Sequence, residues 1–479
     1  MLITPIFYFL IIFCLQFKYK NATRILIVAP NRYTSHFNFH KSMALSLVNE
    51  EWVDNVTLFV VEEDHRNRDH NLMGTNKLKI FYYPTYNVDQ QTANIYEFSD
   101  FSAAHCLNKS TNNLNLEILK SIHGDIKKYF EIANDQHLIQ ALCLRQYQVC
   151  INELRYYPLF PILQLIECKH IVATSNMPLE SIYYHYLGLL PNIIENGIPV
   201  VLRIKTEKQQ GESSSSNNPH ELAVLQKKKE IEKFDIFFEQ IGGENYFENI
   251  IKYVIKFIFV NTQSLIDFEA MSYINDKKII NIGGIAIQQN NQNLNIKEAS
   301  IFNFAFQNNK QIIFVSFGTM IDSRHLTDIQ INNLVRNFGL FSNYIFIWAI
   351  KDYDNKIYKL NNYDNIKRED RVNQTAILAH PLTILFISHC GINSSLEAVK
   401  YGKPLLCAPF IADQFYNSQA LASREVAKVV DDRIFENIFQ NILDALNLQE
   451  NMSNLQNQMN NSDINPEQTF LEKIAELNN

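Results

Sequence analysis

Several polar side chains follow an apolar run in the last third of the sequence. The segment ILFISHCGINSS (384–395) passes from large apolar residues to His389 and Gly391, and Asn393 and Ser394 come next. We expect a strand, a tight turn at the glycine and then a helix. Because a helix N-terminus has unpaired N–H groups and a positive dipole end, this stretch predicts a phosphate site. His389 would donate to a phosphate oxygen, and Ser394 would add a hydroxyl donor.

Three more side chains extend the predicted site. Glu397 lies one turn inside the expected helix, where its carboxylate could accept a pair of ribose hydroxyls. Asp413 and Gln414 follow the next expected strand, so they lie at the same edge of the sheet and suit sugar hydroxyls. Ordinary structural readings exist for single residues, such as Asn393 as a helix cap and His389 as a core histidine. The combination in one stretch favours a nucleotide-sugar site.

The order of these groups resembles a known family signature. Residues 386–414 carry His-x-Gly, Asn-Ser, Glu, Gly-x-Pro and Asp-Gln in the order found in the UDP-glycosyltransferases, which include UDP-glucuronosyltransferases and plant UDP-glucosyltransferases. SFGT (316–319), IGGI (282–285) and FIW (346–348) also resemble landmarks of that family. The resemblance implies the GT-B fold, in which two Rossmann-like domains enclose a cleft.

The resemblance also implies a role for each matching residue. It assigns the diphosphate to His389, Asn393 and Ser394, the ribose to Glu397, and the donor sugar to the Asp-Gln pair. The whole set expected to bind the UDP-sugar is Ser316, Gly318, Thr319, Arg371, Gln374, His389, Gly391, Asn393, Ser394, Glu397, Asp413 and Gln414.

The sequence departs from the family pattern at the expected base site. Family members usually carry Trp-x-Pro-Gln there, with the tryptophan stacked on uracil, whereas this chain has Arg371, Val372, Asn373 and Gln374. A guanidinium can also stack on a base plane, so Arg371 is the expected substitute. Its charge and flexibility predict a weaker or less selective base site.

A candidate general base follows the first apolar run, RILIVAP (24–30). His36 lies in the expected loop after this run, and His40 falls on the helix-like segment that follows. A histidine base near the anomeric carbon typically contributes about 10²–10⁴ in rate. The family also has Ser-His at this point, which supports His36. Glu153, at the end of YQVCINE, is the expected carboxylate partner; an ordinary edge carboxylate is the alternative.

The elements that position these groups alternate between apolar runs and longer periodic segments. This pattern predicts an α/β fold of two tandem, doubly wound Rossmann-like domains with an inter-domain cleft. We expect a signal peptide at 1–20, an acceptor-binding domain at 21–270, a UDP-sugar-binding domain at 271–445 and a helical tail at 446–479. The second strand series is expected to begin near KKIINIGGI (277–285).

Net charge and the apolar N-terminus indicate which partners and which cell compartment to expect. The net charge is −7, which argues against nucleic acid or an anionic membrane surface as the main partner. The apolar start predicts a secretory leader, with a membrane anchor or a buried strand as alternatives, and no later run is long enough to span a bilayer. We therefore expect a protein of the endoplasmic reticulum lumen or a secreted one. The cysteines after the leader have no metal-ligand spacing, and their pairing stays open: Cys106, Cys143, Cys150, Cys168, Cys390 and Cys407.

These features predict an inverting transferase that moves glucose or glucuronate from UDP to a hydroxyl of a small lipophilic acceptor. No cofactor is expected, because the UDP-sugar is a co-substrate. No metal is expected either, although Asp352 and Asp354 resemble an Asp-x-Asp metal motif, because they lie in a polar loop and a helix N-terminus already serves the phosphate. The alternative is a catalytically weak secreted protein that binds a nucleotide or a lipophile.

Overall fold

The structure is a computed structural model of the chain. It describes residues 23–63, 68–84, 132, 135–201, 218–242, 245–274, 276–287, 293–353, 355–357, 363–430, 434–462 and 464–478. The expected signal peptide at 1–20 lies outside the described residues.

The first domain is built on a seven-stranded parallel sheet. The order β3-β2-β1-β4-β5-β6-β7 reverses direction between β1 and β4, and a reversal of this kind opens a crevice at the carboxyl ends of the strands. Successive residues of β1 face opposite sides, because Ile25 and Ile27 pack in one hydrophobic cluster and Leu26 and Val28 in another. The strands are β1 (Thr23–Val28), β2 (Val53–Glu62), β3 (Leu78–Pro84), β4 (Val149–Glu153), β5 (His170–Ser175), β6 (Ile255–Val260) and β7 (Ile279–Asn281).

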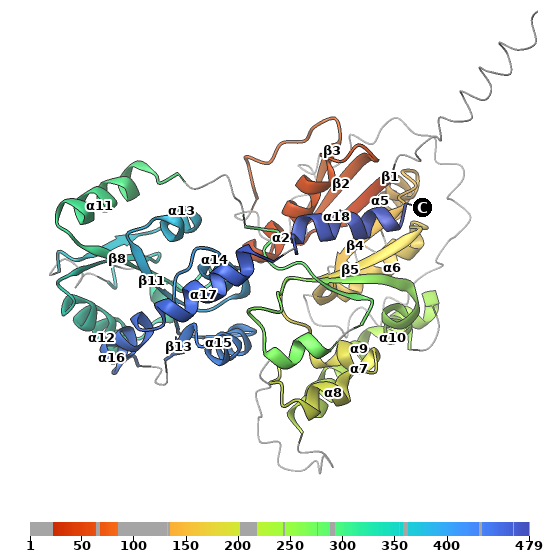
Figure 1. The fold of residues 1–479 in the computed structure, drawn as a ribbon. Coiled ribbons are helices and arrows are strands. Elements are labelled where there is room, and N and C mark those ends of the chain that lie inside the picture. Colours follow the sequence, from red (N-terminus) through yellow and green to blue (C-terminus); the bar gives the residue numbers. More distant parts are fainter. Residues whose placement is uncertain are drawn as a thin grey trace, which may run out of the picture.

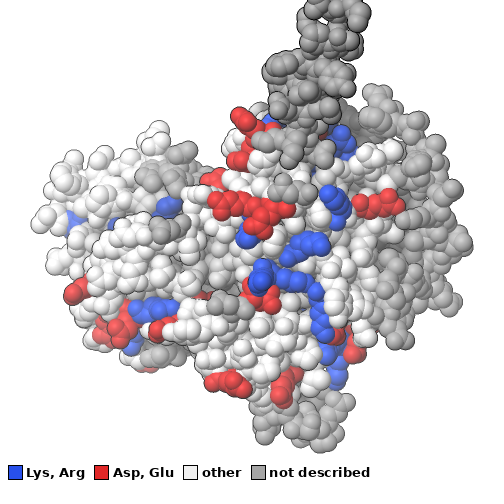
Figure 2. All heavy atoms as spheres, turned by 45° about the vertical axis from the view of Figure 1, so that its right-hand side comes forward, with Lys and Arg blue, Asp and Glu red and all other residues white. Residues whose placement is uncertain are grey.

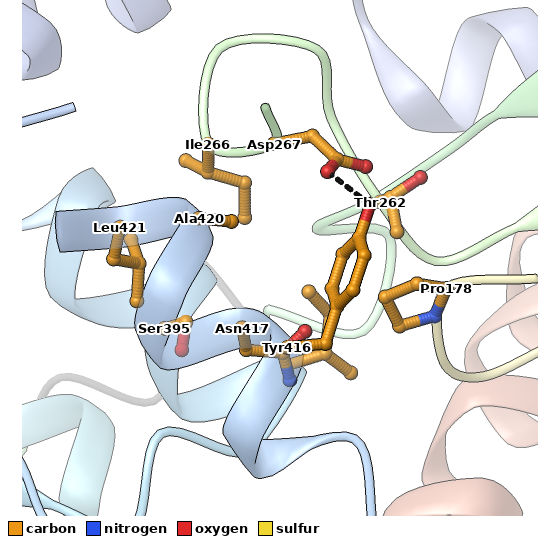
Figure 3. A pocket seen from close by; sticks show the side chains of 10 residues that line it. Pro178, Thr262, Ile266, Asp267, Ser395, Tyr416, Asn417, Ala420 and Leu421 are labelled. Atoms are coloured by element: carbon orange, nitrogen blue, oxygen red, sulfur yellow. Dashed lines mark hydrogen bonds between the residues drawn. The ribbon is translucent and has the colours of Figure 1, made fainter. Parts of the chain in front are cut away.

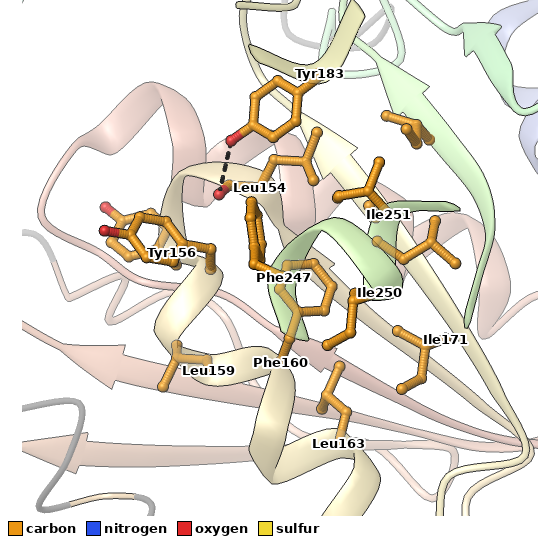
Figure 4. Packing of buried hydrophobic residues seen from close by; sticks show 14 of the residues in the cluster. Leu154, Tyr156, Leu159, Phe160, Leu163, Ile171, Tyr183, Phe247, Ile250 and Ile251 are labelled. Carbon is orange, nitrogen blue, oxygen red and sulfur yellow. Dashed lines mark hydrogen bonds between the residues drawn. The ribbon is translucent and has the colours of Figure 1, made fainter. Parts of the chain in front are cut away.

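Helices cover both faces of this sheet (Figure 1). On the face away from α2, Phe247 packs against Phe160, with ring centroids 6.4 Å apart (Figure 4). The Tyr157 ring lies 5.1 Å from the Phe247 ring. This aromatic packing ties the last helices of the domain to the elements that follow β4. The helices are α2 (Thr34–Leu47), α5 (Gln136–Cys143), η2 (Leu154–Leu159), α6 (Phe160–Leu165), α7 (Ser181–Tyr186), α8 (Leu190–Glu195), α9 (Pro219–Gly242), α10 (Tyr246–Asn249), η3 (Ile250–Val254) and η4 (Glu269–Tyr273).

The second domain repeats the plan with six parallel strands. Its order, β10-β9-β8-β11-β12-β13, places the reversal between β8 and β11. The strands are β8 (Gln311–Ser316), β9 (Tyr344–Ala349), β10 (Ile366–Glu369), β11 (Thr383–Ser388), β12 (Leu405–Cys407) and β13 (Ala427–Val429). The helices are α11 (Ile296–Gln307), η5 (Ser323–His325), α12 (Asp328–Gly339), α13 (Gln374–Ala379), α14 (Ile392–Lys400), α15 (Gln414–Ser423) and α16 (Ile438–Leu446). The predicted fold class, two Rossmann-like α/β domains, is confirmed.

The chain ends with two helices that lead back to the first domain. α17 (Gln449–Asn460) packs against α14, and α18 (Pro466–Glu476) packs against α2 (Figure 1). Phe470 and Ile474 of α18 are fully buried, and the Phe470 ring lies 5.1 Å from that of Phe259 in β6. The C-terminal segment therefore joins the two domains through a hydrophobic contact.

Three assignments made from the sequence need correction. The strand in KKIINIGGI is β7, which pairs with β6 at the edge of the first sheet, so the second strand series begins at β8. The first domain thus extends past residue 270, because the connection through η4 returns the chain to the same sheet. The apolar run IPVVLRI (198–204) also predicts a strand, but its residues 198–201 are not in one, and the sheet position next to β5 is filled by β6.

Two disulfides connect neighbouring strands. Cys150 of β4 pairs with Cys168, which lies just before β5, and Cys390 after β11 pairs with Cys407 of β12. Each bond spans one crossover connection, with separations of 18 and 17 residues.

The surface carries charges of both signs. On the face drawn in Figure 2, acidic and basic side chains are interspersed, in keeping with the modest net charge of −7. Within the described ranges, we find no helix with the length and apolar character that crossing a bilayer requires.

Candidate active site

His36 and Glu153 meet at the strand-order reversal of the first sheet. His36 lies in the first turn of α2 rather than in the loop expected before it, and Glu153 is the last residue of β4, next to β1. The His36 Nδ1 atom is 2.5 Å from Glu153 Oε1, and the two residues are 9% and 1% exposed. Burial alone would raise the pKa of Glu153, but the charge and hydrogen bond of His36 lower it below its ordinary value. The carboxylate therefore holds a proton on Nδ1 and leaves Nε2 as the acceptor.

His40 has a structural role one turn further along α2. Its Nδ1 lies 2.9 Å from the His36 carbonyl oxygen and its Nε2 lies 2.8 Å from Thr174 Oγ1. The ring is fully buried, and this burial lowers the pKa of His40. Both ring nitrogens are engaged, so His40 holds α2 against β5, and His36 is the histidine with a nitrogen available for chemistry.

His389 lies between two glycines at the strand-order reversal of the second sheet. A Cβ atom placed on Gly318 or on Gly391 would lie 2.6 Å from His389 Nε2. Gly318 also has a φ of +77°, a conformation that favours glycine. Burial lowers the pKa of His389 to about 4, so the ring is neutral at physiological pH. The glycines of SFGT and His-x-Gly thus make room for one imidazole.

The N-terminus of α14 has no side-chain cap. Its N-cap is Gly391, which leaves the first-turn N–H groups available to an anion. Ser394, in this turn, accepts a hydrogen bond of 3.1 Å from Gln374 Nε2. Asn393 accepts one of 2.6 Å from Asn261 Nδ2 of the first domain. Asn393 therefore links the two domains as well as lying at the expected phosphate position.

Glu397 is held in place by the first turn of α13. Its carboxylate accepts hydrogen bonds from Gln374 Nε2 and, at 2.6 Å, from Thr375 Oγ1. Burial raises the pKa of Glu397, and these two hydrogen bonds oppose the rise. The side chain expected to bind ribose is therefore oriented before any ligand arrives.

The segment that departs from the family pattern is held by hydrogen bonds of Asn373. Asn373, which stands where proline is usual, caps α13 by accepting a hydrogen bond from the Ala376 N–H, and its own N–H donates to Glu298 Oε1 at 2.7 Å. Proline has no N–H and could not make this second bond. Glu298 is fully buried and also forms a capping box with Asn295. Arg371 is exposed just before this turn.

Asp413 and Gln414 begin α15, opposite the His36 region. Asp413 accepts a hydrogen bond of 2.8 Å from Asn417 Nδ2. Burial raises the pKa of Asp413, while the hydrogen bond from Asn417 and the electrostatic effects of His36, when protonated, and of Arg155 oppose the rise. The Oε1 atom of Gln414 accepts hydrogen bonds from two backbone N–H groups of its own loop, at 2.8 and 3.0 Å. The expected sugar-binding residues thus lie within electrostatic reach of the candidate base.

A polar contact between the domains lies beside this site (Figure 3). The Tyr416 hydroxyl donates to Asp267 Oδ1 at 2.7 Å, and the Arg424 side chain donates to the carbonyl oxygens of Ser264 and Asp267. Burial raises the pKa of Asp267 to about 6. Sequence reasoning missed this contact, because its members belong to no motif and are about 150 residues apart.

The other predicted residues lie at the edges of the site. Ser316 is buried at the end of β8, and its Oγ accepts a hydrogen bond of 3.4 Å from the Gly318 N–H, whereas Thr319 is exposed. Asp352 of the Asp-x-Asp sequence accepts hydrogen bonds from the Ile357 N–H, and Asp354 lies outside the described residues.

Comparison with known proteins agrees with this geometry. Residues 268–470 match the family described as UDP-glucoronosyl and UDP-glucosyl transferase. Over this part of its length, the chain is similar to the UDP-glycosyltransferases. Its relatives include ugt-48 of Caenorhabditis elegans, 29% identical over 188 residues, which make up 39% of this chain and 34% of ugt-48. The ecdysteroid UDP-glucosyltransferase of Autographa californica nuclear polyhedrosis virus is 33% identical over 119 residues, or 25% of this chain and 23% of the relative. The chain thus spans about a third or less of the curated relatives that it matches first.

A solved structure matches almost the whole chain. Phytolacca americana UGT2, complexed with UDP-2fluoro-glucose and pterostilbene, has a TM-score of 0.60 and 16% identity over 95% of this chain and 99% of its own. The GT-B fold expected for the family is therefore confirmed for both domains.

Proposed function

We propose that the protein is an inverting UDP-sugar transferase that moves glucose or glucuronate to a hydroxyl of a small lipophilic acceptor. The observation that carries this proposal is the His36–Glu153 pair at 2.5 Å, which lies within electrostatic reach of Asp413 in the opposite domain. A base-carboxylate pair thus faces the residues that the family signature assigns to the donor sugar.

In the proposed reaction, Nε2 of His36 takes the proton of the acceptor hydroxyl. The acceptor oxygen then forms a bond to the anomeric carbon while the bond from that carbon to the phosphate oxygen breaks, and UDP leaves with the electron pair. Attack from the side opposite to UDP inverts the anomeric carbon and gives a β-glycoside from an α-linked donor. Glu153 stabilises the imidazolium that forms, since its carboxylate bonds the other ring nitrogen.

The leaving diphosphate would be bound at α14. The uncapped N–H groups after Gly391 supply donors and the positive end of the helix dipole, which stabilises negative charge as it develops on UDP. The oriented carboxylate of Glu397 would take the ribose hydroxyls, and Arg371 would lie against the base. The second domain would therefore bind the donor and the first domain would supply the base. The reaction would require the two domains to be held together.

The test is a screen for UDP release from the purified protein. It uses UDP-glucose and UDP-glucuronate, each with a panel of phenols and sterols. Acceptor-dependent release of UDP from either donor is the expected result. No release from any pair, under conditions in which UDP protects the protein against heat, would contradict the proposal.

A second candidate is a catalytically weak protein that binds a nucleotide or a lipophile. The exposed Arg371 at the usual tryptophan position favours it, because a mobile cation holds a base less selectively than an indole. UDP binding without turnover over the whole panel would support this candidate.

We further propose that the protein folds in the secretory pathway. The disulfides Cys150–Cys168 and Cys390–Cys407 support this, since such bonds persist in oxidising compartments. Alkylation of the protein from its native source, before and after reduction, would detect the bonds; thiols that are all reactive before reduction would argue for a reducing compartment.

A further inference from the structure

Arg155 lies beside the candidate base and belongs to none of the sequence motifs. It is two residues after Glu153, at the start of η2, so it emerges at the carboxyl edge of β4. Its guanidinium lies 5.2 Å from the centroid of the Tyr33 ring, and that ring lies 5.5 Å from the His36 ring. Arg155 is therefore one aromatic side chain away from the proposed reaction centre.

The guanidinium of Arg155 has N–H donors without a partner among the residues that the structure describes. The side chain is exposed, and within the described parts of the chain it makes no hydrogen bond and no ion pair. Neighbouring protein atoms remove part of the hydration of Arg155 and disfavour its charge, but Tyr33, Glu153 and other acidic groups raise the pKa of Arg155 above its ordinary value. Arg155 is thus a permanent cation whose N–H groups can donate to a bound ligand.

The surrounding acids do not neutralise this cation by contact. The Oε1 atom of Glu153 is already bonded to His36, and Glu180 acts on Arg155 only through its electrostatic field. Arg155 also acts electrostatically on Asp413 of the second domain, which places its charge near the residue assigned to the donor sugar. Its position suits an anionic group on a molecule bound between His36 and Asp413.

We infer that Arg155 binds a carboxylate carried by one of the substrates and so determines which substrates react. The planar guanidinium matches a carboxylate in bidentate geometry, whereas a neutral hydroxymethyl group gains much less from it. The inference rests on the proposed transfer reaction. The carboxylate can belong to the transferred sugar, as in UDP-glucuronate, or to the acceptor, as in a hydroxybenzoate.

The experiment compares three substrate pairs on the full-length protein. UDP-glucose with phenol is the pair without a carboxylate, UDP-glucuronate with phenol carries it on the sugar, and UDP-glucose with 4-hydroxybenzoate carries it on the acceptor. The variants are Arg155→Gln, Arg155→Lys and the control Arg336→Gln, which removes an exposed arginine from α12 in the second domain. Thermal protection by each donor and acceptor alone is measured in parallel.

We expect Arg155→Gln to lower kcat/KM for one carboxylated pair on the order of 10- to 100-fold relative to UDP-glucose with phenol. Arg155→Lys should recover part of the loss, Arg336→Gln should change nothing, and the affected pair identifies the source of the carboxylate. Equal losses for all three pairs, or no loss for either carboxylated pair, would overturn the inference. If no pair turns over, the proposed function fails, and the inference is then decided by thermal protection: Arg155→Gln must selectively weaken protection by UDP-glucuronate or by 4-hydroxybenzoate.

Discussion

Replacement of Glu153 by glutamine should slow the chemical step without weakening UDP binding. The wild-type carboxylate bonds His36 Nδ1 at 2.5 Å, and Glu153 is 1% exposed. A hydrogen bond to a charged group contributes about 1.5–3 kcal/mol, and an opposite charge about 4 Å away adds up to ~4 kcal/mol near a protein surface. Because the hydrogen bond and the charge attraction overlap, they are not added, and we expect the variant to lose about 3–4 kcal/mol of imidazolium stabilisation. Since 1.36 kcal/mol is tenfold in rate, kcat should fall about 10²–10³-fold.

The assay is acceptor-dependent UDP release at saturating donor, together with calorimetric measurement of the UDP affinity. The matched control is Glu62→Gln, which changes another buried carboxylate at a strand end, one that pairs with Arg68 instead of a histidine. The control should lower stability but leave kcat within about threefold once the folded fraction is corrected. A Glu153→Gln protein that is folded, binds UDP normally and keeps kcat within threefold would refute the role of the carboxylate.

Three further perturbations test other parts of the structure. Gly391→Ala places a Cβ 2.6 Å from His389 Nε2 and should weaken UDP binding at least about tenfold by displacing the ring, as measured by calorimetry; unchanged affinity would contradict this. Asp267 has a pKa of about 6 in the folded state and an ordinary value of 3.8, so between about pH 4 and 6 the folded protein keeps a proton that the unfolded chain releases. The free energy of unfolding should therefore fall by about 3 kcal/mol as pH rises through that window. Urea unfolding should show this fall in the wild type relative to Asp267→Asn, and parallel pH profiles would argue against it. Phe470→Ala removes a fully buried ring and should cost about 3–5 kcal/mol, whereas Phe306→Ala, at a ring 75% exposed, should cost less than about 0.5 kcal/mol; equal costs would show that α18 does not stabilise the fold.

Much of the architecture could be predicted from local patterns. The apolar runs QIIFVSFGT (311–319) and YIFIWAI (344–350) are typical of buried parallel strands, which are apolar on both faces, and they form β8 and β9. β10 has no apolar run, because it lies at the sheet edge and three residues of its IKRE sequence are charged, and β13 has only three residues. Whether β7 joins the first or the second sheet depends on where the connection after β6 leads, and the local sequence does not contain that information.

Only part of the candidate site could be predicted from local sequence. The donor residues from His389 to Gln414 are close in sequence and follow two strands of one sheet, so their proximity could be predicted. The His36–Glu153 pair could be proposed because each residue follows a strand, but its contact depends on the pairing of β1 with β4. The bond from Asn373 to Glu298 joins residues 75 positions apart, and only the capping box at Asn295 was a local signal for Glu298.

Interactions between the domains could not be predicted from the sequence. The hydrogen bond from Asn261 to Asn393 joins ordinary polar residues 132 positions apart. The position of Arg155 beside the candidate base also depends on the fold, since a single arginine after a strand is usually a solvated surface residue. Such features become visible only when the docking of the two sheets is known.

The central claim is that His36 is the base for transfer from a UDP-sugar. The most direct measurement is acceptor-dependent UDP release by the wild type and by His36→Ala, with the affinity of each protein for UDP determined on the same preparation. Turnover that falls at least about 10²-fold in the variant, with UDP affinity unchanged, is the result that the account predicts. Turnover by His36→Ala at the wild-type rate would contradict it.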